Sequence, residues 1–152
     1  CLLCIGVLMV SCSIRAEITI QAEPHRVWEI LTRFEEYPAW NPFIIRAQGV
    51  PRTGERLTLT MKPGKRPMTF RSTVLEASEN QSLEWLGRLG IPGIFDGQHR
   101  FELNPLPGGG THLMQSEIFS GLLVPLMPKL LDNTRESFRR LNEALAHRAE
   151  EN

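Results

Sequence analysis

Cysteine is scarce in this sequence and confined to one end of it. The 152 residues include three cysteines, Cys1, Cys4 and Cys12, and all lie within the first dozen positions. Cross-links from one short segment cannot hold a whole domain together, so the body of the chain must depend on its core. Cys1 and Cys4 have the two-residue gap of a zinc knuckle. No second pair or histidine follows nearby, so we expect no metal site.

An excess of charge of one sign is missing as well. The chain has 17 basic and 17 acidic residues and a formal net charge of zero. Such a balance gives no general attraction to nucleic acid, and no interleaving of basic and aromatic residues suggests RNA binding. The phosphate-cradling, dinucleotide, metalloprotease and serine-hydrolase motifs are also absent from the sequence. We therefore expect neither a nucleic-acid partner nor a cofactor.

Long hydrophobic runs are absent. The apolar opening, residues 1–10, is too short for a bilayer span, which needs about 20 residues. It resembles a targeting remnant or short anchor, a lipoprotein cleavage site with Cys12 lipidated, or sequence upstream of a natural start at Met9. The last is favoured because a strand pattern begins directly afterwards. We expect an apolar extension over residues 1–12, one domain over residues 13–149, and a cytoplasmic location, with membrane anchoring or export as the alternative.

Periodicity predicts the elements near the start of the chain. Apolar and polar residues alternate from Ile14 to Ile20, which is typical of a strand with one buried face. Pro24 then opens a segment with helical spacing that ends near Arg33. Pro38 and Pro42 prevent a long continuation, so a second short helical turn and a loop are expected over residues 35–43.

The rest of the chain divides into strands and one helix. From residue 44 to residue 121 the alternation predicts about six antiparallel strands, separated by turn signals at residues 51–54, 63–64, 80, 92–93 and 107–110. After Gly121 the spacing becomes helical and predicts a long amphipathic helix starting near Pro128. The predicted fold is α+β, with a curved antiparallel sheet of six to seven strands wrapped around this helix and two short helices after the first strand.

Three polar residues fall on otherwise apolar strand faces. His99, Gln115 and Glu117 share the parity of their buried neighbours, and pairing of their two strands places His99 close to Gln115 or Glu117. A buried carboxylate is costly unless paired, so Glu117 should find a donor such as His99 or be protonated. Three roles remain open: a buried pair that fixes the register, recognition of a ligand, or acid/base catalysis with His99 as the base.

Two further segments carry alternatives. Trp40, Asn41 and Phe43 lie in a proline-bounded loop that either closes a cavity mouth or packs at the sheet edge. The hairpin tip at residues 89–94 is apolar where turns are normally polar. It either forms a lip that contacts a ligand or a membrane, or packs against residues 122–126.

Four strings resemble a known superfamily: EPHRVWEIL (23–31), EYPAWNPF (36–43), LEWLGRLGIPGIFDGQHRFEL (83–103) and GGGTHLMQSEIFSGLLVPLMP (108–128). Together with the predicted layout they are similar to the SRPBCC superfamily, which includes START lipid-binding domains, the birch-pollen allergen family and bacterial polyketide cyclase/dehydrase-like proteins. The small bacterial-type branch is the most similar. The resemblance covers residues 13–149. It implies the helix-grip fold, with a deep apolar cavity between sheet and helix, open at one end.

Side-chain sizes and strand parity indicate what such a cavity would contain. Ala16, Ser72 and Gly87 are small and stand beside larger inward residues, which predicts a cavity of moderate size. The candidate ligand-binding residues are Trp40, Asn41, Phe43, Phe70, Trp85, Gly87, Phe95, His99, Phe101, Gln115, Glu117, Phe119, Met127, Leu130, Leu131 and Phe138.

The resemblance implies a binding protein for a small hydrophobic molecule such as a lipid, polyketide, isoprenoid or aromatic compound. One fold hosts many functions, so two alternatives stay open. The first is a cyclase- or dehydratase-like enzyme that uses His99 and Glu117. The second is a protein-interaction module like the helix-grip regulators of chaperones. A transient membrane contact and either a monomer or a weak dimer are compatible with the sequence.

Overall fold

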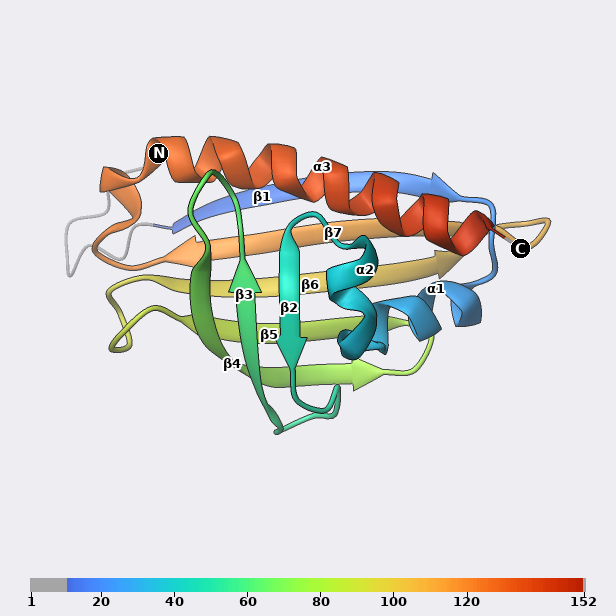
Figure 1. Ribbon diagram of the computed structural model, residues 1–152, viewed down its shortest axis with the longest axis horizontal. Helices are drawn as coiled ribbons and strands as arrows, with labels where there is room; N and C mark the ends of the chain where they lie inside the picture. Colours follow the sequence, from blue (N-terminus) through green and yellow to red (C-terminus); the bar gives the residue numbers. More distant parts are fainter. Residues whose placement is uncertain (1–10, 152) are drawn as a thin grey trace.

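The computed structural model describes residues 11–151 of the chain and has the predicted order of elements (Figure 1). Cys1 and Cys4 lie outside the described residues. The first strand begins at Ser11, so Cys12 is part of it, half-buried opposite Phe119. The elements are β1 (Ser11–Ile20), α1 (Pro24–Thr32), η1 (Phe34–Glu36), α2 (Tyr37–Trp40), β2 (Ile44–Gln48), β3 (Arg56–Met61), β4 (Met68–Ser78), β5 (Ser82–Arg88), β6 (Asp96–Pro105), β7 (Thr111–Ser120), η2 (Val124–Leu126) and α3 (Pro128–Glu150).

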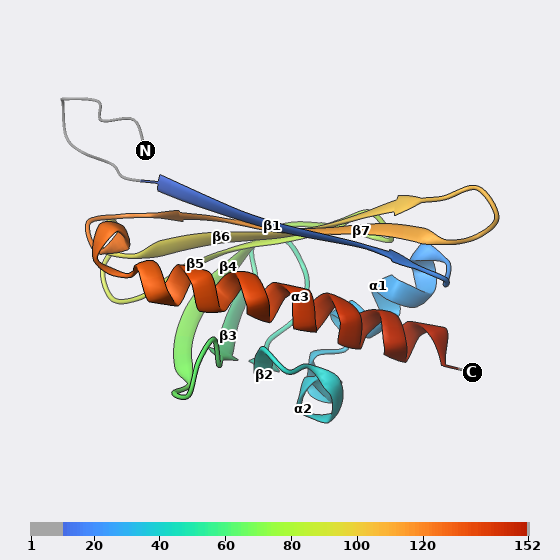
Figure 2. The same ribbon diagram turned by 90° about the horizontal axis from the view of Figure 1, so that it is seen from above.

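All seven strands join one antiparallel sheet in the order β1-β7-β6-β5-β4-β3-β2. The sheet curls, so that β2 and β3 stand across one side of it while α3 lies along the concave face (Figures 1 and 2). β1 and β7 lie side by side although they come from opposite ends of the chain. This is the predicted α+β helix-grip arrangement, and the prediction of the fold class is confirmed.

The two short helices close one end of the curled sheet. α1 begins at Pro24, whose ring suits a first-turn position, and it buries Val27, Ile30 and Leu31. The chain then turns through η1 and α2. Asn41 ends this segment, because its side-chain oxygen accepts the backbone N–H groups of Phe43, at 3.0 Å, and Ile44, at 2.8 Å. These bonds direct the chain into β2.

α3 covers the core with a single stripe. It begins at Pro128, where the missing N–H costs nothing in the first turn. Phe138, Leu141 and Leu145 are fully buried against the sheet, and Thr134 lies on the same stripe one turn earlier. Burial of each large apolar side chain stabilises the fold by about 1.5–3 kcal/mol. The helix therefore holds the curvature of the sheet as well as covering it.

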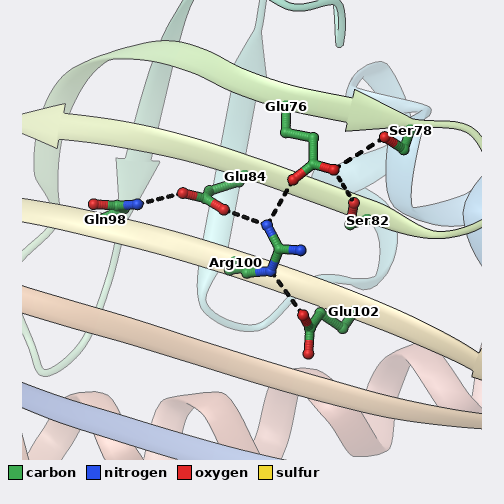
Figure 3. A network of polar contacts seen from close by, with 7 residues as sticks. All are labelled: Glu76, Ser78, Ser82, Glu84, Gln98, Arg100 and Glu102. Atoms are coloured by element: carbon green, nitrogen blue, oxygen red, sulfur yellow. Dashed lines mark hydrogen bonds and ion pairs between the residues drawn. The ribbon is translucent and has the colours of Figure 1, made fainter.

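Arg100 organises a polar network on the convex face of the sheet (Figure 3). Its guanidinium contacts three carboxylates from three strands: Glu76 at 2.7 Å, Glu84, and Glu102 at 2.9 Å. Glu84 also accepts a hydrogen bond from the side-chain amide of Gln98. The Arg100 guanidinium, with help from neighbouring hydroxyl groups, lowers the pKa of Glu76. One cation thus balances three carboxylates that would otherwise repel one another.

Replacing Arg100 by methionine should lower the free energy of unfolding at neutral pH by about 1–2 kcal/mol, because three neighbouring carboxylates lose their shared cation. The loss should shrink as the pH falls below the usual range of glutamate, where the carboxylates of the variant become protonated. Urea denaturation at both pH values measures it. Arg46→Met serves as the control, since the exposed Arg46 has no ion pair with a described residue. An equal loss at both pH values would contradict the electrostatic account.

Candidate functional site

A small apolar pocket lies between the concave face of the sheet and the first turns of α3. Its volume is about 30 Å³, little more than a single water occupies. Ligand pockets for drug-sized molecules usually measure about 300–1,000 Å³. The prediction of a moderate cavity is therefore wrong for this structure. The physical reason is that Phe101, Phe138 and Trp85 fill the interior around His99 with their rings.

The floor of the pocket is a row of small residues on three adjacent strands. Ser72 on β4 pairs with Gly87 on β5, and Gly87 pairs with Gly97 on β6. A Cβ atom at Gly97 would lie 2.5 Å from Oε1 of Glu117, and one at Gly87 would lie 3.0 Å from Oγ of Ser72. The missing side chains thus leave the space that the Glu117 carboxyl and the Ser72 hydroxyl occupy.

Glu117 brings the one carboxyl group among the described residues that line this pocket. It comes from β7, is 6% exposed, and has no hydrogen-bond partner among the described residues. Burial raises its pKa to about 8. The group is therefore mainly protonated at neutral pH and presents an O–H donor to a mostly apolar space.

His99 lies behind Glu117 in the core and does not line the pocket. Its ring is fully buried and packs on Trp85, Phe101 and Phe138 at centroid distances of 4.9, 4.7 and 4.9 Å. Burial lowers its pKa to about 3. His99 is accordingly neutral at physiological pH.

A chain of hydrogen bonds fixes the tautomer of that neutral ring. The Gln115 amide donates to Oδ1 of Asn142 on α3 at 2.7 Å, so its oxygen is turned toward His99. Nε2 of His99 lies 2.9 Å from that oxygen and must donate to it. Nδ1 of His99 is left without a proton, 3.6 Å from Oε2 of Glu117. The separation is longer than a hydrogen bond.

This geometry favours roles opposite to those of the catalytic alternative. The catalytic alternative made His99 the general base and Glu117 the group that orients it. In the structure the predicted closeness of the two residues is present, since His99 and Glu117 pair directly across the β6–β7 ladder. However, Glu117 faces the pocket and His99 is enclosed behind it. The group able to exchange a proton with a pocket occupant is Glu117.

The raised pKa of Glu117 makes stability depend on pH in a defined window. The pKa of Glu117 is about 8 in the folded protein, above its ordinary value of 4.5. Between pH 4.5 and pH 8 the folded protein therefore keeps a proton on Glu117 that the unfolded chain releases. Stability from this group is therefore full below pH 4.5 and falls as the pH rises toward 8. Glu117→Gln cannot ionise, so its free energy of unfolding relative to the wild type should rise by about 2 kcal/mol across the window. Urea denaturation near both limits measures the difference, and a constant difference would contradict the assignment.

No metal site is evident in the part of the chain that the structure describes. Residues 11–151 contain no group of three or more histidine, cysteine, aspartate or glutamate side chains placed to hold an ion. Within the same residues no helix combines the length and the apolar character needed to cross a membrane.

Comparison with known proteins places the chain in a family. The sequence profile of the family described as "Polyketide cyclase / dehydrase and lipid transport" matches residues 11–150. The chain belongs to this family. No curated protein matches it.

Solved structures show the same fold at low sequence identity. A START superfamily protein from Mycobacterium smegmatis is 24% identical, with a TM-score of 0.74 over 91% of this chain and 97% of that one. Norcoclaurine synthase from Thalictrum flavum is 13% identical, with a TM-score of 0.71 over 97% and 98% of the two chains. A hypothetical protein from Helicobacter pylori is 12% identical, with a TM-score of 0.78 over 91% and 88%. These likenesses show the same fold in all four chains.

Within this family fold, the sequence-predicted candidates separate into three groups. The following line the pocket: Phe43, Phe70, Trp85, Gly87, Phe95, Glu117, Phe119 and Leu130. Four lie in the core beside or behind it: His99, Phe101, Gln115 and Phe138. Four lie away from its lining: Trp40, Asn41, Met127 and Leu131.

The loop predicted to close the cavity mouth contributes only Phe43 to the pocket. Trp40 packs on Tyr37 at a centroid distance of 5.3 Å, and Asn41 uses its side chain to hold the backbone at the start of β2. Instead, the β3–β4 hairpin, β6 and α3 supply lining residues that the predicted set of candidates did not contain: Met61, Pro63, Met68, Ser72, Gly97 and Thr134. The inward parity of Ser72 and Gly97 was a usable signal, whereas the hairpin contacts depend on the curl of the sheet.

Proposed function

We propose that the protein reversibly binds a small hydrophobic molecule that carries one hydrogen-bond-accepting oxygen, with the protonated Glu117 carboxyl as donor. The single observation behind this proposal is an acid without a hydrogen-bond partner in an apolar pocket. Such a group is costly to bury, and an occupant with a carbonyl or hydroxyl oxygen would compensate for that cost.

A second polar group supports the same reading. Oγ of Ser72 also lines the pocket, is buried, and has no hydrogen-bond partner among the described residues. Ser72 and Glu117 lie on either side of the Gly87–Gly97 pair, so one occupant over the glycines could contact both. A few convergent polar groups in an apolar lining are what fixes a ligand's orientation.

The pocket must widen to admit such an occupant, because its volume is about 30 Å³. The side chains that line the pocket include Met61 and Met68, at the two ends of the β3–β4 turn, and Leu130 in the first turn of α3. Methionine has three rotatable bonds and adapts readily to a new neighbour. We therefore place the opening motion in the β3–β4 hairpin and the first turn of α3.

Two probes of nearly equal shape test the donor role of Glu117. Acetylnaphthalene has a carbonyl oxygen and ethylnaphthalene does not. Isothermal titration calorimetry should find the ketone bound about 3–10-fold more tightly by the wild type, which is the usual net contribution of one hydrogen bond. Glu117→Leu should lose this preference and Glu117→Gln should keep it. Equal binding of the two probes by the wild type would reject the proposal.

A bound natural ligand can be sought directly by native mass spectrometry of the purified protein, followed by solvent extraction. A reproducible adduct that carries an oxygen function and is absent from Glu117→Leu would support the proposal. An adduct retained equally by that variant would place the binding site elsewhere.

A second candidate function rests on the same carboxyl. A pKa of about 8 lets Glu117 give and take a proton near neutral pH, as a general acid or base must. The enzyme would be a cyclase or dehydratase with Glu117 as its proton donor. In that case Glu117→Gln should abolish turnover of a substrate while leaving its binding intact, whereas a pure binding protein would show no turnover to lose.

A further inference from the structure

The three most exposed large hydrophobic side chains of the described residues gather at one end of the molecule. Ile91 in the β5–β6 turn is 67% exposed, and Leu122 and Leu126, between β7 and α3, are 65% and 75% exposed. The two segments are joined, because Leu122 N–H donates to Gly93 O at 3.1 Å and Leu123 N–H donates to Ile94 O at 3.0 Å. Both loops lie beyond the same end of the sheet (Figures 1 and 2).

The two segments therefore contact each other, as one of the sequence alternatives predicted, yet the side chains of Ile91, Leu122 and Leu126 remain exposed to solvent. Buried side chains such as Phe95 and Val124 account for the contact with the core. Ile91 and Leu126 add nothing to that contact, and exposed apolar clusters of this kind are typical of interaction surfaces. We name the exposed Ile91, Leu122 and Leu126 the apolar tip.

A basic groove borders the apolar tip on the convex face of the sheet. The open groove has a volume of about 510 Å³, and Gly90 and Pro92, the neighbours of Ile91, form part of its wall. Its charged residues are Arg56, Arg71 and Arg88, and none of the described residues that line it carries a carboxylate. Arg88 lies 3.7 Å from Asp96, while Arg56 and Arg71 form no ion pair with a described residue. The groove thus offers uncompensated positive charge.

The opposite flank of the apolar tip is also basic. Lys65 and Arg66 in the β3–β4 turn and Lys129 at the start of α3 are exposed, and none has an ion pair with the described residues. The turn lies against α3, since a Cβ atom at Gly64 would be 3.3 Å from the Asn133 amide. The whole chain has zero net charge, so this local excess of basic residues is compensated elsewhere on the surface.

We propose that this end of the molecule docks on an anionic phospholipid bilayer, with the apolar tip entering the interface and the basic groove contacting phosphate groups. Apolar side chains flanked by lysine and arginine are what such a surface binds. Part of the pocket wall comes from segments at the same end, because Pro63, Phe95 and Leu130 belong to its lining. The docking inference goes beyond the proposed ligand binding and rests on different residues.

Vesicle co-sedimentation tests the docking. Vesicles of phosphatidylcholine with about 30% phosphatidylglycerol should retain the protein, and pure phosphatidylcholine should retain it at least about tenfold more weakly. Arg56→Ala with Arg71→Ala should reduce the partition coefficient about 25-fold, at about fivefold per arginine. Ile91→Asp with Leu126→Asp should reduce it by at least about tenfold.

Two control residues belong neither to the apolar tip nor to the lining of the basic groove. Val50→Asp replaces another exposed apolar residue, and Arg46→Ala removes another unpaired arginine. Both should bind anionic vesicles as the wild type does. Equal binding to neutral and anionic vesicles, or tip and groove variants that bind as well as these controls, would overturn the proposal.

Two further outcomes distinguish membrane docking from dimer formation and from the proposed ligand binding. If the wild type is a dimer that Ile91→Asp dissociates and no vesicle binding occurs, the apolar tip is a contact between two copies and the proposal is rejected. Glu117→Leu should sediment with vesicles like the wild type. Lost vesicle binding with intact preference for acetylnaphthalene would therefore reject the docking surface alone, and the converse would reject the ligand site alone.

Discussion

Replacing Gln115 by leucine should lower the free energy of unfolding by about 3 kcal/mol, although leucine is apolar and similar in size. Gln115 is fully buried and joins His99 on β6 to Asn142 on α3. Leucine would leave the Nε2 proton of His99 and the oxygen of Asn142 without partners. Each unsatisfied buried group costs about 1–3 kcal/mol. Urea denaturation of the wild type and the variant measures the loss.

A double variant shows whether the missing hydrogen bonds are the cause. Adding His99→Phe to Gln115→Leu removes the donor along with its acceptor, and replacing both partners by apolar groups can be nearly neutral. The double variant should therefore lose less stability than the sum of the two single variants. Additive losses would mean that the packing of Gln115, and not its hydrogen bonds, stabilises the core.

Gly97→Val should weaken the binding of acetylnaphthalene by at least about tenfold, while the protein remains folded. A Cβ atom at this position would lie 2.5 Å from Oε1 of Glu117. The carboxyl is the end of a flexible side chain, so it can move aside, but it then leaves the pocket floor. Valine also suits a strand, so the free energy of unfolding should change by less than about 1 kcal/mol.

The control for this variant is a valine on the other face of the sheet. Thr73→Val lies on β4 at an exposed position and should leave affinity for the probe unchanged. Calorimetric titration gives the affinities and circular dichroism checks the fold. Binding of the probe by Gly97→Val at the wild-type affinity would show that the occupant does not lie over the glycine row.

The elements of this fold could be predicted because each has one buried face. Alternation on β6 and β7, with a short turn between them, also sets the register that pairs His99 with Glu117. The hydrogen bond of His99 could not be assigned in the same way. His99 bonds to Gln115, its diagonal neighbour on β7. The orientation of the Gln115 amide is set by its hydrogen bond to Asn142. Asn142 lies on α3, and alternation along the strands does not predict where that helix lies.

The extent of the pocket was beyond sequence reasoning for a different reason. Its width depends on how tightly the sheet curls and how rings from several elements interlock around His99, and neither follows from the order of small and large residues. The same holds for Met61 and Met68, which reach the pocket because the β3–β4 hairpin lies against α3. Asn41 was predicted to contact a ligand, whereas its side chain binds the backbone at the start of β2. These hydrogen bonds depend on the local turn of the backbone, which the sequence pattern does not give.

The affinity for acetylnaphthalene as a function of pH, measured for the wild type and for Glu117→Gln, tests the central claim most directly. A protonated Glu117 donates to the carbonyl oxygen, and an ionised one cannot. Wild-type affinity should be constant below pH 8 and fall by about tenfold above it, in step with the pKa of Glu117. Glu117→Gln should bind equally at every pH, because its amide donates throughout. A wild-type affinity independent of pH, or an identical fall in Glu117→Gln, would contradict the assignment of Glu117 as the donor in the pocket.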